Sequence, residues 1–354
     1  MLRYDNSADN PRNPSNPPKR ALFGEESFDE MGTVGLTMVT VRKEDEPALR
    51  KALADGAQAA IQRGAADGTA RRYLLHQAAQ RTPATAPRSM ITLVDRQGKA
   101  VQTVGELGSY SQPALSPDGK QVAVIRNDQG KTNVWVLDVA SGKATQITSD
   151  PAPHASPVWS FDGKQIAYVS NQNDVYRKAS DGSGKEELLY KHPAGGAFIT
   201  DWSVDGRLCF WSADVIYALP VDGDRKPVRL ISGARGGRFS PDARYLAYSS
   251  NQSGRFETYI ASLDNPSQKP LQVSKEAALG GIFWRQDSKE LYFFNLVGLV
   301  PSALLAADIT VGPEPQAGVP LILFPLAGVG SPAQVSNIAT RDGERFVLLA
   351  APPR

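Results

Sequence analysis

The chain is poor in the residues that proteins use to build metal and redox sites. Its 354 residues include one cysteine, Cys209, and three histidines, His76, His154 and His192. A single cysteine excludes an internal disulfide and a cysteine-based zinc site, and no two histidines have the short spacing of a zinc-binding pair. Cys209 lies in the apolar stretch RLCFW, which favours a buried and unreactive thiol.

An imbalance of charge and a long hydrophobic run are missing as well. The 39 Lys and Arg residues nearly balance the 37 Asp and Glu residues, so we expect no nucleic-acid binding. No run of about 18 apolar residues is available to span a membrane. The Asn/Pro-rich start lacks the apolar segment of a secretory signal.

Catalytic motifs are equally scarce. The sequence has no G-x-S-x-G nucleophile elbow, and the stretch DGSGKEE at 181–187 lacks the spacing of a phosphate-binding loop. We therefore expect a protein that is not an enzyme by itself and that needs no cofactor.

What the sequence has in abundance is one repeated turn motif. The stretch LSPDGKQVAVI returns five more times in degraded form, each copy being followed by further short apolar strands. The anchor aspartates of the six copies are Asp118, Asp162, Asp205, Asp242, Asp287 and Asp342, at spacings of 44, 43, 37, 45 and 55 residues. Four short strands in about 40–45 residues is the period of a β-propeller blade.

The strand count also predicts how the ring closes. The last copy supplies only two strands, and residues 89–104 supply a pair of strands before the first copy. We expect 89–104 to pair with 333–351, which completes the sixth blade and removes open sheet edges. The predicted fold is an all-β, six-bladed propeller over residues 89–354, preceded by a short, partly helical region.

The unit SPDGK followed by an apolar strand resembles the PD40 (WD40-like) repeat of TolB-type propellers. This resemblance covers residues 89–354 and implies a periplasmic or extracellular, monomeric propeller that binds a peptide, a protein or a small ligand. Because this fold serves many roles, it does not identify the ligand by itself. The binding site is therefore sought in the loops.

The anchor aspartates are interpreted as structural turn residues. In Pro-Asp-Gly the proline presets the first turn position, the carboxylate caps a nearby amide and the glycine takes the left-handed position. A catalytic acid would be expected once rather than six times, and a calcium loop needs several oxygen ligands at close spacing. The aromatic residues three positions earlier, such as Trp159, either fill the space between blades or form a stacking platform.

The loops that gather at one mouth of the channel are the candidate binding site. The candidate residues are His154, His192, Arg235, Arg238, Asn127, Asn171 and Asn251. The two arginines favour a carboxylate or an acidic peptide as the ligand. In the alternative interpretation the histidines are solvated loop residues and the asparagines only satisfy turn geometry.

The first 88 residues differ in composition from the rest. Helical spacing predicts helices over 46–64 and 69–80, and the Pro/Ala-rich segment 81–88 is the expected linker.

The start, YDNSADNPRNPSNPP followed by FGEESFDEMG, resembles the end of copper type II, ascorbate-dependent monooxygenase-like domains. Met31 stands at the position of that family's copper-ligating methionine, whose thioether suits Cu(I). The family's upstream histidines have no counterpart here, so we expect the segment to be a remnant that holds no copper alone. The alternative function is the C-terminal part of a redox enzyme whose histidine ligands lie upstream.

Overall fold

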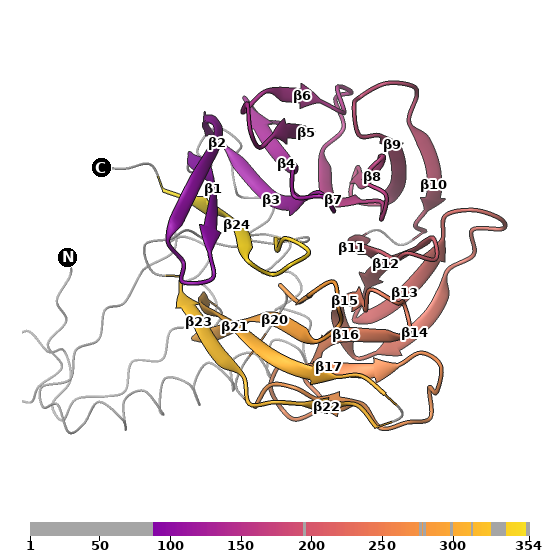
Figure 1. Cartoon of the computed structure of the whole chain (residues 1–354). Coiled ribbons are helices and arrows are strands. Elements are labelled where there is room, and N and C mark those ends of the chain that lie inside the picture. Colours follow the sequence, from indigo (N-terminus) through magenta and orange to yellow (C-terminus); the bar gives the residue numbers. More distant parts are fainter. Residues whose placement is uncertain are drawn as a thin grey trace, which may run out of the picture. The chain divides into compact units, whose positions relative to one another are not determined.

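The computed structural model describes residues 88–193, 196–275, 278, 281–297, 300–312, 314–326 and 338–351. Every regular element in these residues is a β-strand, and the strands form six sheets around a central axis, as Figure 1 shows. The prediction of an all-β, six-bladed propeller is thereby confirmed. The two predicted helices, nearly all of the linker and Met31 lie outside the described residues.

Four blades are regular antiparallel sheets in which the strands follow chain order. Blade 1 holds β3 (Tyr110–Leu115), β4 (Gln121–Asp128), β5 (Lys131–Asp138) and β6 (Ala144–Gln146). Blade 2 holds β7 (His154–Trp159), β8 (Gln165–Ser170), β9 (Asp174–Ala179) and β10 (Glu187–Lys191). Blade 3 holds β11 (Phe198–Trp202), β12 (Arg207–Ser212), β13 (Val215–Pro220) and β14 (Val228–Ser232). Blade 4 holds β15 (Ala234–Phe239), β16 (Tyr245–Ser250), β17 (Glu257–Ser262) and β18 (Leu271–Gln272).

The last two blades depart from this pattern. Blade 5 holds β19 (Phe283–Trp284), β20 (Glu290–Val297), β21 (Val300–Thr310) and β22 (Gln316–Ala317), and β23 (Leu321–Pro325) also pairs with β21. Blade 6 combines both ends of the propeller: β24 (Arg345–Ala350), β1 (Ser89–Asp95) and β2 (Ala100–Gly108). A bridge between Ala339 and Phe346 adds the innermost segment of that blade.

The ring is closed by the antiparallel pairing of β1 with β24. Their register runs without a bulge from Met90 opposite Ala350 to Asp95 opposite Arg345. The next residue, Arg96, reaches from this hairpin to blade 5. Its guanidinium lies 2.8 Å from Glu290 Oε1.

The Arg96 guanidinium also donates to the last anchor turn, through a 3.1 Å bond to the Gly343 carbonyl oxygen. The Tyr292 hydroxyl donates to Glu290 Oε2 at 2.7 Å. Burial by itself would raise the pKa of Glu290, but the bonds from Arg96 and Tyr292 outweigh burial and hold that pKa below its ordinary value. The network therefore ties blade 5, the first hairpin and the last anchor together.

The second strand of each blade is buried on both faces, because neighbouring blades stack against each other. In β8 the consecutive residues Ile166, Ala167, Tyr168 and Val169 are all at most 1% exposed. The buried clusters accordingly combine side chains of adjacent blades, blade 1 with blade 2 and blade 3 with blade 4 among them. This stacking explains why these strands are continuously apolar rather than alternating.

Four of the six anchors, Asp118, Asp162, Asp242 and Asp342, form the same hydrogen-bonded turn. Asp118 Oδ1 accepts from the Ser116 hydroxyl at 2.7 Å and from the Lys120 amide at 3.0 Å, while Ser116 Oγ accepts from the Gln121 amide at 2.9 Å. The bond from hydroxyl to carboxylate recurs at Asp162, Asp205, Asp242 and Asp342. At Asp287 the guanidinium of Arg285 takes the place of the hydroxyl.

The residue after the anchor aspartate adopts a left-handed backbone, with φ of 73° at Gly163 and 74° at Gly343. The two glycines differ in their surroundings. A Cβ at Gly163 would lie 3.6 Å from Pro117, whereas one at Gly343 would lie 1.9 Å from the Tyr292 hydroxyl oxygen.

We predict that Gly343→Ala destabilises the protein more than Gly163→Ala. Both variants bear the left-handed penalty of roughly 1–2 kcal/mol. Gly343→Ala must also displace Tyr292 from Glu290, which adds roughly 1–3 kcal/mol of overpacking. Equilibrium unfolding in urea measures the difference, and equal losses would show that Tyr292 does not restrict this position.

A second prediction concerns the anchor carboxylates. The Ser160 hydroxyl and the Lys164 amide hold the pKa of Asp162 below its ordinary value. The bonded carboxylate therefore stabilises the fold above about pH 4, and that contribution is lost as the pH falls through the folded-state pKa. Ser160→Ala should raise the pKa of Asp162 toward its ordinary value in an NMR titration of the carboxyl carbon.

The matched control is Ser180→Ala in the same blade, because the Ser180 hydroxyl donates to the Gly163 carbonyl and not to the carboxylate. This variant should leave the titration of Asp162 as it is. An Asp162 pKa that stays the same in Ser160→Ala would contradict the role given to the hydroxyl.

Candidate binding site at the channel mouth

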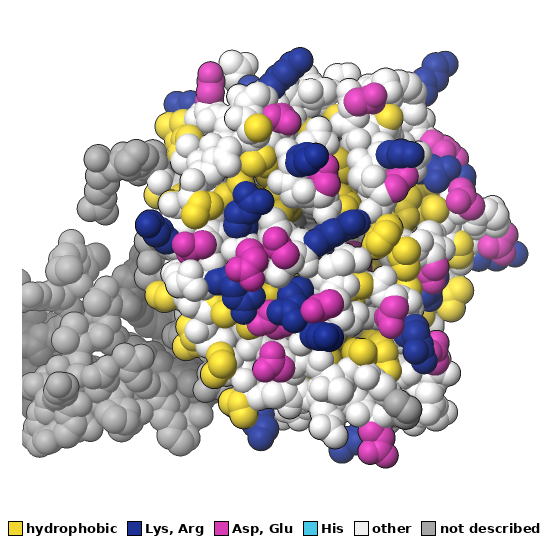
Figure 2. Space-filling view, viewed as in Figure 1, with side chains coloured by type: hydrophobic (Ala, Val, Ile, Leu, Met, Phe, Trp, Pro, Cys, Tyr) yellow, Lys and Arg dark blue, Asp and Glu magenta, His cyan; other side chains and the backbone are white. Residues whose placement is uncertain are grey.

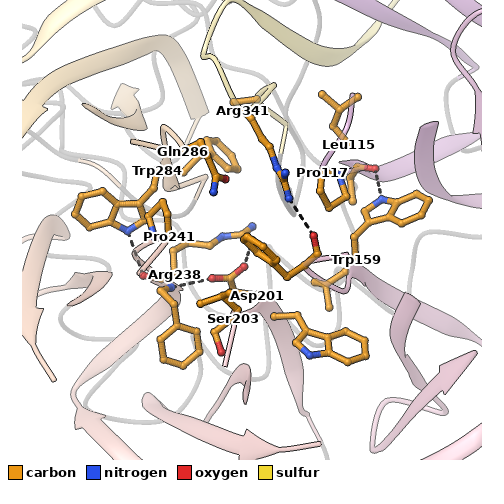
Figure 3. A pocket seen from close by; sticks show the side chains of 18 of the residues that line it. Leu115, Pro117, Trp159, Asp201, Ser203, Arg238, Pro241, Trp284, Gln286 and Arg341 are labelled. Atoms are coloured by element: carbon orange, nitrogen blue, oxygen red, sulfur yellow. Dashed lines mark hydrogen bonds and ion pairs between the residues drawn. The ribbon is translucent and has the colours of Figure 1, made fainter. Parts of the chain in front are cut away.

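A pocket of about 130 Å³ lies where the six anchor turns gather at one end of the channel. We call it the anchor-end pocket, and Figure 3 shows it from close by. Every blade contributes to it the residue that immediately precedes its anchor aspartate. These residues are Pro117, Phe161, Val204, Pro241, Gln286 and Arg341. The repeat thus places one variable side chain per blade around the mouth.

Aromatic side chains form part of the walls of the pocket. The aromatic lining consists of Trp159, Phe161, Trp202, Phe239, Phe283 and Trp284. The Trp159 indole donates to the Ala114 carbonyl of blade 1 at 2.9 Å, and the Trp284 indole donates to the Arg238 carbonyl of blade 4 at 3.3 Å. Each of these rings therefore fills space between two blades and faces the pocket as well.

An ion pair between buried Arg238 and half-buried Asp201 also lines the pocket. Arg238 Nη1 lies 3.7 Å from Asp201 Oδ1, and the Phe239 amide donates to Asp201 Oδ2 at 2.8 Å. The Arg238 guanidinium also lies 5.5 Å from the centroid of the Phe283 ring. Burial raises the pKa of Asp201 and lowers that of Arg238, because both charges are removed from water.

Arg341 also lines the pocket, and Figure 3 shows its side chain extending toward the middle of the view. Starting from blade 6, its Nη2 donates to the Phe161 carbonyl of blade 2 at 3.0 Å, and its guanidinium lies 4.9 Å from the centroid of the Phe161 ring. The charged residues of the lining are Arg238, Asp201 and Arg341. With Arg238 paired to Asp201, the pocket carries one positive charge.

The comparisons with known proteins agree with this architecture. Residues 82–220 match the family model PD40, the TolB beta propeller domain. The fold is that of a TolB-type propeller. A putative TolB from Agrobacterium tumefaciens is similar at 19% identity and a TM-score of 0.58, over 75% of this chain and 99% of that one.

TolB from Acinetobacter baumannii is similar at 15% identity and a TM-score of 0.47, over 67% of each chain, which is too remote to support an argument. No curated protein matches the chain significantly. The fold is shown by the likeness to the Agrobacterium tumefaciens protein.

In this TolB-type fold only Arg238, of the seven candidate binding residues, lines the anchor-end pocket. His154 is buried between blades 1 and 2, since Nδ1 lies 3.1 Å from the carbonyl oxygen of Thr132 in β5 and Nε2 lies 3.1 Å from Asp150 Oδ2. The His192 ring packs edge-on against Phe210, and burial lowers its pKa. The structure therefore gives the two histidines different surroundings.

The remaining candidates lie at the strand ends away from the anchor turns. Arg235 forms an ion pair with Asp214, and its guanidinium lies 5.4 Å from the centroid of the Trp211 ring. The asparagines sit in turns. Asn127 Oδ1 accepts from the Gly130 amide at 2.9 Å, Asn171 has a φ of 52°, and the Asn251 carbonyl accepts from the Gly254 amide at 2.8 Å.

Sequence reasoning missed the anchor-end pocket, although a signal for it was present. Within the motif the residue before the aspartate varies freely, from proline to phenylalanine, valine, glutamine and arginine, while its neighbours repeat. Such a variable position inside a regular repeat indicates a surface that the fold does not constrain.

Other kinds of site find no support in the described part of the chain. Those residues contain no group of three or more His, Cys, Asp or Glu that could hold a metal ion. None of their elements is a helix of the length and apolarity needed to cross a membrane. On the face in Figure 2, acidic and basic side chains are interspersed, without an extended area of one sign.

Proposed function

We propose that the propeller is a non-catalytic binding module that takes a peptide or protein partner at the anchor-end pocket. The observation that carries the proposal is the pocket itself, to which all six blades contribute the residue before the anchor aspartate. Concave sites with apolar walls and a few convergent polar groups are where folded proteins bind ligands.

The size of the pocket limits what can enter it. A volume of about 130 Å³ accommodates one group of about the size of a benzene ring, not a helix or a folded loop. A partner would insert one side chain, and its backbone would lie across the surrounding anchor turns. Phe161 and Val204, which are 37% and 46% exposed, offer apolar contact surface there.

The polar groups of the lining support binding over catalysis. The hydroxyls of Ser160, Ser203 and Ser240 all donate to anchor carboxylates and thus hold the turns in shape. The lining contains no histidine, the side chain that most often activates a serine hydroxyl as a nucleophile.

The proposal includes a periplasmic or extracellular location and a monomeric state, both of which rest on the resemblance to TolB-type propellers. Cell fractionation and light scattering in solution test these two points. A cytoplasmic protein would contradict the location, and a stable dimer would contradict the monomeric state.

We predict that Val204→Arg blocks partner binding. Val204 is exposed on the anchor turn of blade 3, so a longer side chain can extend over the mouth without disturbing the core. Peptides selected on the native protein from a random display library should bind this variant at least about tenfold more weakly in calorimetry, because the entering side chain loses its place.

The matched control is Val228→Arg, in which an exposed valine on the outer strand β14 of the same blade is replaced. This variant should bind the selected peptides as the native protein does. The proposal is refuted if no peptide is enriched, or if the enriched peptides bind Val204→Arg with native affinity.

A further inference from the structure

Arg341 differs from the other charged residues of the pocket lining. Arg238 and Asp201 neutralise each other, whereas no carboxylate among the described residues lies within ion-pair distance of Arg341. Among the described residues its guanidinium contacts the Phe161 carbonyl oxygen and the Phe161 ring. A neutral carbonyl is a weak partner for a guanidinium, which matches a carboxylate in charge and geometry.

Because of the position of Arg341, this weak contact affects which groups can enter the pocket. The side chain lines the pocket and reaches from blade 6 to the Phe161 carbonyl of blade 2, a bond drawn in Figure 3. A single hydrogen bond of 3.0 Å holds its far end against Phe161. A group that enters the pocket therefore has to displace the guanidinium or to bind beside it.

We propose that Arg341 determines the ligand selectivity of the pocket, and that the pocket accepts an aryl group carried next to a carboxylate. The carboxylate replaces the Phe161 carbonyl as the partner of the guanidinium, and the ring enters the aromatic cavity beneath. This inference rests on the proposed function, since it names the chemistry of the group that a partner inserts at the same pocket.

The charge of the Arg341 guanidinium favours an anionic ligand over a neutral one. A carboxylate gives the guanidinium two charge-assisted hydrogen bonds in exchange for the one bond that it loses. A neutral aryl group breaks the same bond without replacing it. Arg341 therefore discriminates against neutral ligands as well as attracting acidic ones.

The lining and the volume of the pocket favour an aromatic ring as the group that enters it. Six aromatic side chains line the pocket, and its volume of about 130 Å³ is close to the roughly 150 Å³ of an apolar cavity that holds benzene. Because Arg238 is already paired with Asp201, the interior needs no second anion. One carboxylate at the rim balances the charge of the occupied site.

Small-molecule probes separate the requirement for an aromatic ring from the requirement for a carboxylate. Phenylacetate carries both groups, phenylacetamide carries the ring alone, and acetate carries the carboxylate alone. The native protein should bind phenylacetate about tenfold more tightly than either of the others in an NMR titration, which corresponds to one charge-assisted contact or one buried ring. Equal affinities for phenylacetate and phenylacetamide would overturn the role of Arg341.

The variant that tests the role of Arg341 in ligand selectivity is Arg341→Gln, and its matched control is Arg244→Gln. Arg244 lies in the anchor turn of blade 4, is paired with Asp264 and does not line the pocket. Arg341→Gln should abolish the preference for phenylacetate over phenylacetamide without weakening phenylacetamide, whereas Arg244→Gln should keep the preference. A preference that survives in Arg341→Gln contradicts the proposal, and thermal unfolding confirms that both variants fold.

Peptide arms identify the source of the carboxylate. A short peptide that ends in phenylalanine is compared with its C-terminal amide and with an amidated peptide that carries Asp-Phe internally. Loss of binding on amidation assigns a C-terminal aromatic residue, and retention by the Asp-Phe peptide assigns an acidic neighbour in the chain. If library peptides bind at the mouth but no aryl carboxylate does, this inference fails and the proposed function stands.

Discussion

The pairing of β1 with β24 is the constraint on which the rest of the structure depends. Without β1 and β2, blade 6 would consist of β24 and the bridge at Ala339, and it would expose an edge where a neighbouring strand is required. The same blade carries Arg341, so this side chain reaches its position in the pocket lining only when the ring is closed. The ion pair of Arg96 with Glu290 adds a polar contact between this hairpin and blade 5. Since burying two charges offsets much of their attraction, we interpret this pair as fixing the register of closure more than as adding stability.

The anchor turn explains how one motif serves both folding and binding. Its hydroxyl, carboxylate and left-handed residue are bonded to each other and to the backbone, as at Ser116, Asp118 and Gly119. The side chain between hydroxyl and carboxylate takes no part in these bonds and points to the channel mouth. It can therefore change from blade to blade without loss of the turn. The six turns thus supply a rigid ring on which six independent side chains define the pocket.

The spacing of the anchors predicted six blades because each blade is a local unit with its own strands and turn. The pocket could not be predicted in the same way, since its residues come from six blades and meet only once the ring has closed. Arg238 was predicted as a ligand for the other mouth, and the structure pairs it with Asp201 in the anchor-end pocket. His154 was a candidate because of its loop, but the contacts that bury it, with Thr132 and Asp150, depend on loop conformations that no spacing reveals.

Hydrogen exchange under native conditions tests whether the two ends of the propeller hold the ring closed. The amides that join β1 to β24 should exchange with the same opening free energy as those of the central strands β8 and β12, because the blades unfold together once closure is lost. If the amides of β1 exchange through a much easier local opening while those of β8 and β12 stay protected, the propeller does not depend on this pairing.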